Sequence, residues 1–355
     1  MLTSARPQFR TEAGGPVWHG RRGALVAAIL VVSGLAASLT GCSGNSGPTL
    51  TLYNAQHQDL AQAWIDGFTA ETGIEVEVRR GGDFELANQI LAEGDASPAD
   101  VFITENSPAL SLLSSKGRLA PLDPATLAQV PARFSSGAGD WVGIAARSTV
   151  LVYNPSLIPA GQLPDSIMEL SGPQWKDRIA VAANGADFQA IASAVFAVNG
   201  DAAAGDWLAG LKQNAKIYPS NVAIMKAVNA GEVPAGVIYH YYWYKDRAES
   251  GQDSRNTELE FFDHGDAGAF VSVSGGGVLA SSNNSAEAQR FVAYMSGKAG
   301  QEVLARTDAL EYTVGEGVAP NPALRPFSEL DPPAVDLNTL NGPKVVAEMQ
   351  RVGLL

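Results

Sequence analysis

Hydrophobic positions in the first third of the chain follow two different spacings. A short continuous apolar run extends from Leu50 to Tyr53. After it, Leu60, Trp64 and Phe68 recur at every fourth position, which gives one apolar stripe along a helix. The same reading predicts strands at 50–53, 74–78 and 99–103 and helices at 60–68 and 84–91. Strands that alternate with helices are typical of a parallel sheet covered on both faces, so we predict an α/β fold.

Two longer apolar runs, at 143–154 and 268–279, interrupt this alternation. We interpret them as long strands that carry the chain into a second domain and back again. The same spacing rules predict further elements between the two runs and after the second one. These are strands at 179–182 and 237–238 and helices at 188–198, 207–211, 222–228, 286–295 and 300–306. The last residues, 320–355, are rich in proline and then helical, and we expect them to wrap the second domain.

Polar side chains follow the ends of two predicted strands. His57 comes after the first strand, and Glu105 comes after the strand at 99–103. Ligands of open parallel sheets bind at the carboxyl ends of the strands. We therefore expect His57 and Glu105 to meet at one crevice.

The turn Asn184-Gly185-Ala186 lies between a predicted strand and a predicted helix. Backbone N–H groups at a helix start attract an anion, so this turn is a candidate anion site. An ordinary helix start with Asn184 as the N-cap explains the same residues.

The first 42 residues have the pattern of an export signal. A basic front with Arg6, Arg10 and Arg21 precedes an apolar run from Ala24 to Ala37, which is of signal-peptide length. The run ends at Cys42 in Leu-Thr-Gly-Cys, which resembles the lipobox of bacterial lipoproteins. We predict a signal peptide at 1–42, lipidation of Cys42 and a flexible tether at 43–48. An ordinary signal peptide with a chance cysteine is the alternative.

Charge and length narrow the class of protein. The net charge is −13, and the predicted signal holds four arginines and one glutamate, so the remainder carries about −16. This charge argues against nucleic acid or an anionic membrane face as the partner. About 310 residues after the signal imply two domains rather than one core. Cys42 is the only cysteine, so no disulfide forms within the chain.

The stretch from Ile238 to Tyr244, I-Y-H-Y-Y-W-Y, is the most unusual in the chain. Tyr241 and Tyr242 cannot reach one small target from within a strand, because neighbouring side chains there point to opposite faces. At a strand end or on the first turn of a helix they can, and two phenols suit a hard, highly charged cation. An aromatic edge strand or a packing cluster is the alternative.

These blocks together resemble the bacterial ferric-iron-binding proteins, which are the substrate-binding components of iron(III) ABC importers. The match extends across the chain from Leu50 to about Leu355 and rests on four blocks: Leu52 to His57, Ser97 to Glu105, Gly143 to Tyr153 around Arg147, and Tyr241 to Trp243. The resemblance implies a two-lobed periplasmic-binding-protein fold that closes on its ligand like a hinged trap. Residues 49–148 and 270–315 would form one lobe, and residues 149–269 and 316–355 the other.

The resemblance also implies the site. Iron(III) would be held by four side chains, with an exogenous anion and a water completing the coordination: His57, Glu105, Tyr241 and Tyr242. The anion, expected to be phosphate, carbonate or citrate, would bind Asn184, Gly185 and Ala186, with help from Asn106 and Asn221. We expect Arg147, His240 and Tyr239 to support the ligands from behind without touching the metal.

The chemistry of these ligands agrees with the resemblance. Phenolate, carboxylate and imidazole suit trivalent iron better than copper(I) or structural zinc. Three anionic ligands balance the +3 charge, so the metal can leave water. Because the phenols ionise on binding, iron uptake should release protons.

We expect Asp187 to point to solvent, because it is rotated about 100° from Phe188, which must face the core.

The implied role is that of an extracytoplasmic binding protein, anchored through Cys42 at the outer face of the cytoplasmic membrane or in the periplasm. It would act as a monomer and deliver iron to an ABC permease with its ATPase subunit. One alternative is a binding protein of the same fold for an oxyanion, a polyamine or an organophosphonate. Another is a secreted metalloenzyme, although the sequence holds no H-E-x-x-H or G-x-S-x-G motif. We therefore expect a protein that is not an enzyme.

Overall fold

The computed structural model describes residues 48–355. The predicted signal peptide, Cys42 and residues 43–47 of the predicted tether lie outside the described residues. In chain order the strands are β1 (Thr49–Asn54), β2 (Glu75–Arg80), β3 (Val101–Ile103), β4 (Val142–Tyr153), β5 (Ile179–Val181), β6 (Ala215–Ile217), β7 (Ala235–Tyr239), β8 (Glu258–Glu260) and β9 (Val271–Val278). The α-helices are α1 (Gln58–Thr72), α2 (Asp83–Glu93), α3 (Ser107–Ser115), α4 (Pro124–Leu127), α5 (Ala186–Asn214), α6 (Asn221–Ala230), α7 (His240–Glu249), α8 (Ser285–Ser296), α9 (Lys298–Arg306) and α10 (Gly342–Val352).

The first third of the described chain forms the expected parallel strands. β1 pairs in parallel with β2 on one side and with β3 on the other. Helix α1 buries the predicted stripe of Leu60, Trp64 and Phe68. It ends at Thr72 because Gly73 adopts a left-handed conformation, with φ of 71°, and its N–H bonds the carbonyl of Thr69. The predicted α/β alternation is therefore confirmed here.

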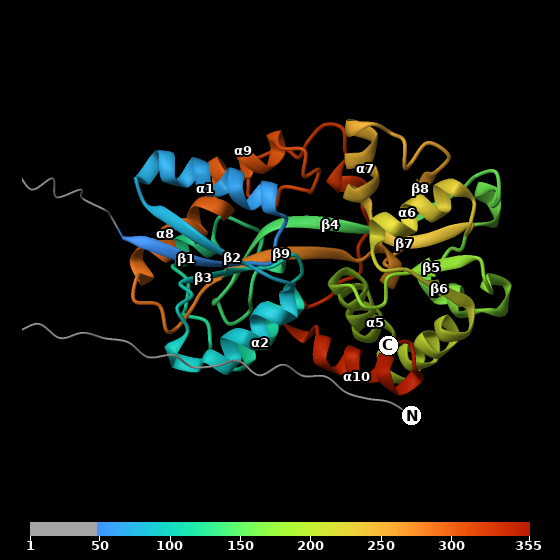
Figure 1. The fold of residues 1–355 in the computed structure, drawn as a ribbon, viewed down its shortest axis with the longest axis horizontal. Helices are drawn as coiled ribbons and strands as arrows, with labels where there is room; N and C mark the ends of the chain where they lie inside the picture. The colour runs from blue at the N-terminus through green and yellow to red at the C-terminus, as the bar shows by residue number, and fades with distance from the viewer. Residues whose placement is uncertain (1–47) are drawn as a thin grey trace, which may run out of the picture. The chain divides into compact units, whose positions relative to one another are not determined.

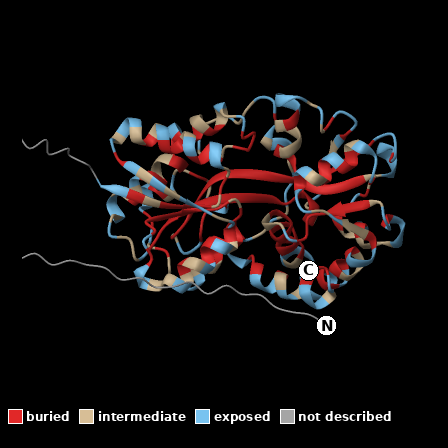
Figure 2. Ribbon diagram, in the orientation of Figure 1, coloured by how far each residue is buried: buried red, intermediate tan, exposed pale blue. Residues whose placement is uncertain are grey.

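Strands β4 and β9 continue the sheet from its first group of strands to its second, as Figure 1 shows. The strand order is β2-β1-β3-β9-β4-β7-β5-β6, with β8 paired to β4. β4 pairs with β9 as far as Ser148 and with β7 from Thr149 onward. All twelve residues of β4 are buried, and in Figure 2 both strands are red along their length. The two long strands predicted from the sequence are thus confirmed.

Beyond β4, the strands β7, β5 and β6 lie parallel to one another. The predicted helices at 188–198 and 207–211 are two parts of one element, α5, which is kinked at Gly200, where φ is 78°. β7 ends at Tyr239, and α7 begins at the next residue, so no loop separates them. α10 packs against α5. In residues 48–355 no helix is both long and apolar enough to cross a membrane.

Candidate functional site

The two adjacent tyrosines lie on the first turn of α7. Tyr239 is still extended, with φ of −90° and ψ of 149°, and His240 begins the helix. The rings of Tyr241 and Tyr242 are side by side, with centroids 4.1 Å apart and an angle of 32° between their planes. On a helical turn both hydroxyls can reach one target, which a strand would have prevented. Of the two arrangements that suit a shared cation, the structure has the helical one.

His57 and Glu105 meet the tyrosines at the carboxyl ends of β1 and β3. His57 Nε2 lies 2.9 Å from the hydroxyl oxygen of Tyr241, a residue 184 positions away in the sequence. His57 Nδ1 lies 3.4 Å from Glu105 Oε1. The ring of His57 is also edge-on to that of Tyr242, with centroids 6.4 Å apart. The expected meeting of His57 with Glu105 is confirmed.

Asp187 is part of the same cluster, so the expectation that it faces solvent is wrong. Its side chain is 4 % exposed. Oδ1 accepts a hydrogen bond from Asn106 Nδ2 (2.9 Å), and Oδ2 accepts from Asn221 Nδ2 (2.6 Å) and the Tyr242 hydroxyl (3.0 Å). The helical rotation away from Phe188 does not lead to water, because the first turn of α5 is buried on both sides. One side meets the core, and the other meets this cluster.

Two of the residues expected to hold an exogenous anion are therefore bonded to a carboxylate of the chain itself. The amides of Asn106 and Asn221 both donate to Asp187. The alternative interpretation of the turn before α5, with Asn184 as the N-cap, is wrong, because the N-cap is Gly185. Asp187 thus occupies the position in which Asn106 and Asn221 were expected to bind phosphate, carbonate or citrate.

A network of buried polar groups fixes the loop that carries Glu105 and Asn106. Asp83, the first residue of α2, accepts hydrogen bonds from the backbone N–H groups of both, at 2.9 and 3.0 Å. Asn106 Oδ1 accepts from the hydroxyls of Ser272 (2.7 Å) and Tyr239 (3.2 Å). Tyr239 thus contacts the cluster through Asn106. Asp83 was not anticipated, and its only signal in the sequence is an acidic residue at a helix start after two glycines.

Arg147 is a fully buried cation that packs against the cluster. Its guanidinium carbon is 5.3 Å from the centroid of the Tyr241 ring, and its Nη2 donates to Glu311 Oε2. Burial alone would lower the pKa of Arg147, but Glu311, Tyr241 and Glu105 outweigh burial and raise this pKa well above its usual value. Arg147 thus stays charged and favours negative charge on the phenol above it. Glu311 is 164 residues away in the sequence, and no local pattern marks it as the partner of Arg147.

Burial sets the protonation of the cluster in the absence of a metal. It raises the pKa of Tyr241 and of Tyr242 well above the usual value of 10. Burial and the nearby Asp187 raise the pKa of Glu105 well above its usual value of 4.5. Burial, Arg147 and Lys245 lower the pKa of His57 to about 3, so its imidazole is neutral and can offer a lone pair. A cation entering the cluster would favour the ionised oxygens instead.

The side chains gathered here are oxygen-rich ligands with one imidazole. No three His, Cys, Asp or Glu side chains within residues 48–355 lie close enough together to hold a metal ion by themselves. The hydroxyl oxygens of Tyr241 and Tyr242, beside His57 and Asp187, add to the donors available to a metal here. Phenolate and carboxylate oxygens with one imidazole suit a hard trivalent ion.

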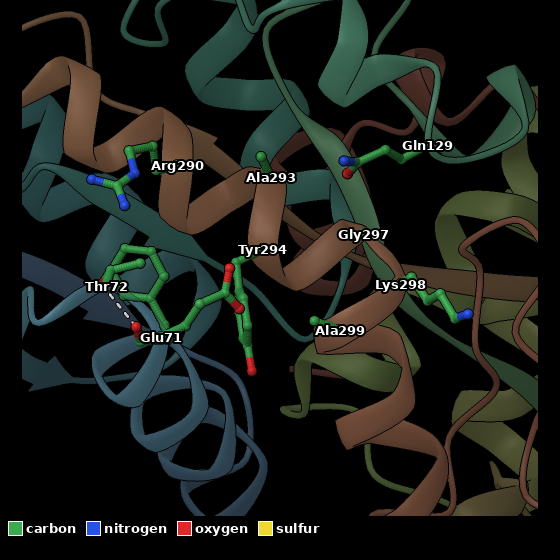
Figure 3. Close-up of a pocket in the computed structure, with 10 residues that line it drawn as sticks. Glu71, Thr72, Gln129, Arg290, Ala293, Tyr294, Gly297, Lys298 and Ala299 are labelled. Carbon is green, nitrogen blue, oxygen red and sulfur yellow. Dashed lines mark hydrogen bonds between the residues drawn. The ribbon is translucent and has the colours of Figure 1, made fainter.

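A separate pocket of about 320 Å³ lies between the end of α1 and helices α8 and α9, as Figure 3 shows. Glu71, Arg290, Tyr294 and Lys298 are among its lining residues, and none of the predicted site residues lines it. It therefore has no part in the site at Tyr241 and Tyr242.

Comparison with known proteins places the chain in a family. Residues 96–330 match the family described as bacterial extracellular solute-binding proteins. The chain is 53% identical over 306 residues to the Fe(3+)-binding periplasmic protein of Serratia marcescens, a match that spans 86% of this chain and 90% of that protein. The chain belongs to the bacterial ferric-iron-binding proteins.

Solved structures agree with this assignment. The iron-bound HitA of Pseudomonas aeruginosa has a TM-score of 0.82 at 44% sequence identity, covering 86% of this chain and all of that one. The Trichodesmium protein IdiA (FutA), in complex with iron and citrate, has a TM-score of 0.76 at 27% identity, covering 86% of this chain and 99% of that one. The chain thus has the two-lobed fold of periplasmic binding proteins, as predicted. Its relatives are binding proteins rather than enzymes.

Proposed function

We propose that this protein captures iron(III) at the cluster on the first turn of α7 and delivers it to a membrane permease. The observation that carries the proposal is the series of contacts that brings two phenols, one imidazole and two carboxylates together. His57 Nε2 is 2.9 Å from the Tyr241 hydroxyl, and Asp187 Oδ2 is 3.0 Å from that of Tyr242. Relatives named for Fe(3+) binding support the same cargo.

We propose that iron takes five ligands from the chain: His57, Glu105, Asp187, Tyr241 and Tyr242. Four of these are anionic when ionised, so the ferric ion is more than neutralised, and buried Arg147 supplies a compensating positive charge. One position of a six-coordinate ion remains for water or a small anion such as phosphate, carbonate or a citrate carboxylate. Asp187 would thereby supply an oxygen at a position that the resemblance assigns to an exogenous anion.

We infer that the lobes meet where β4 changes its neighbour. Residues 49–148 and 270–315 would form one lobe, and residues 149–269 and 316–355 the other. The change from β9 to β7 between Ser148 and Thr149 supports this division. His57 and Glu105 then lie on one lobe, and Asp187, Tyr241 and Tyr242 on the other. Iron bound by both sets would favour the closed arrangement, because the open one offers only part of the ligands.

Membership in a family of extracellular solute-binding proteins supports a position outside the cytoplasm. We propose that Cys42 carries a lipid anchor and that the partners are an ABC permease and its ATPase subunit.

Titration of the metal-free protein with ferric citrate tests the proposed cargo. Iron(III) bound to phenolate absorbs visible light, so we expect a visible band that rises to a plateau at one iron per chain. Zinc, which cannot give this charge-transfer band, serves as the control metal. A protein that stays colourless, or that retains no iron after passage through a desalting column, would contradict the proposal.

A further inference from the structure

The N–H group of Ser148 lies where β4 leaves one neighbour for another. Ser148 is opposite Val271 of β9, and Thr149 is opposite Tyr239 of β7. The Ser148 N–H is buried and donates to a side chain, His240 Nδ1, at 3.1 Å. A buried backbone N–H without a partner would be costly, so this imidazole completes the hydrogen bonding of β4 at the change of neighbour.

The bond fixes the state of the imidazole. A backbone N–H can only donate, so His240 Nδ1 accepts and the ring proton is on Nε2. The ring is fully buried. It stacks on Tyr312, with centroids 4.7 Å apart and 23° between the planes. Tyr312 is itself tied to β4 by two backbone hydrogen bonds with Ala146, at 2.8 and 2.9 Å. His240 is thus held by β4 both directly and through Tyr312.

His240 is also the first residue of α7, directly before the tyrosine pair. Its ring is edge-on to that of Tyr241, with centroids 6.2 Å apart. A side chain that joins the start of this helix to β4 fixes where the two phenols lie relative to the crossing strand. The bond to Ser148 and the stacking on Tyr312 therefore join the helix start of one proposed lobe to residues of the other, directly beside the tyrosine pair.

We propose that His240 is a positioning residue for iron binding, which couples the tyrosine pair to β4 at its change of neighbour; this inference rests on the proposed function. It touches neither the metal nor any of its ligand atoms. Its contribution is to keep both phenolate oxygens in the geometry that the ferric ion needs. Loss of the acceptor leaves the helix start free to shift, and iron is then released faster.

Three variants distinguish an effect on the position of the tyrosine pair from an effect on the stability of the folded protein. His240→Phe keeps a ring on Tyr312 but removes the acceptor for Ser148. His240→Asn offers a side-chain oxygen at a similar distance from the backbone and restores that acceptor. Asp246→Asn is the matched control, because Asp246 is a buried residue of the same helix that accepts from the Ser254 hydroxyl at 2.5 Å, away from the tyrosine pair.

The readouts are the rate at which a competing chelator removes iron, the position of the visible band at full loading, and the melting temperature of the metal-free protein. We expect His240→Phe to release iron about 10 to 100 times faster, the range for residues that orient metal ligands, and to shift the band. His240→Asn should restore both values to near those of the wild type. Asp246→Asn should lower the melting temperature while the release rate and band stay at wild-type values.

Release from His240→Phe at the wild-type rate would overturn the proposal, as would an equal acceleration in Asp246→Asn. If His240→Phe does not fold, His240→Leu replaces it, since leucine also removes the acceptor for Ser148 and keeps an apolar side chain in the buried space; unchanged release there would also overturn the proposal. A wild-type protein that forms no band would contradict iron binding itself and not the coupling through His240.

Discussion

Replacing Tyr241 or Tyr242 with phenylalanine is expected to abolish most of the iron binding and the visible band. Each change removes one anionic oxygen and keeps the ring, so packing in this buried cluster is largely preserved. Residues that only orient metal ligands cost about 10- to 100-fold in affinity when they are lost. We expect the loss of a ligand atom to exceed about 100-fold for each tyrosine. The measurement is competition against a chelator of known ferric affinity.

Tyr244→Phe is the matched control for these variants. Tyr244 lies on the same helix, and its side chain packs edge-on against His240 at 5.8 Å between centroids. It has no hydrogen bond to the cluster among those that the described residues make, so the same substitution should leave the band in place. Wild-type iron affinity in both Tyr241→Phe and Tyr242→Phe would show that the phenols are not ligands.

Replacing Asp187 with alanine is expected to make iron loading depend on an added anion. In the wild type, the Asp187 carboxylate takes the hydrogen bonds of Asn106 and Asn221, so tight loading should need no phosphate, carbonate or citrate. Asp187→Ala removes one anionic oxygen and frees both amides. We expect loading without added anion to weaken by at least about 100-fold, more than the loss of a residue that only orients a ligand, and an added anion to restore part of it.

The control for this prediction is Asp206→Ala, which removes an exposed carboxylate from the same helix. Loading of that variant should match the wild type with and without anions. Loading is measured by titration of iron into protein freed of anions, with each anion added back in turn. If Asp187→Ala loads as tightly as the wild type in the absence of anions, Asp187 is not a ligand.

Much of the fold could be predicted because its signals are local. The apolar stripe of α1 and the long buried runs of β4 and β9 follow from side-chain spacing alone. The surroundings of the first turn of α5 are harder to predict. Helical spacing predicts that Asp187, which is rotated away from Phe188, faces solvent, but this holds only for a helix with one buried face. At the end of a helix that abuts a polar cluster, both faces are buried, and the spacing within the helix cannot reveal this.

The ligands could be named through a family resemblance, whereas the residues behind them could not be placed by sequence. His57 and Glu105 follow strand ends, which is a pattern that parallel sheets make interpretable. The pairing of Arg147 with Glu311, and of His240 with the Ser148 N–H, joins residues that are 164 and 92 positions apart. Such contacts depend on how β4 packs against other parts of the chain, and no periodicity in the sequence encodes them.

The most direct test of the proposed site is an anomalous difference map, collected at the iron absorption edge from crystals of the iron-loaded protein. We predict one strong iron peak within bonding distance of the Tyr241 and Tyr242 hydroxyl oxygens, His57 Nε2, and carboxylate oxygens of Glu105 and Asp187. A peak elsewhere on the molecule, or an iron bound only by water and citrate, would contradict the account.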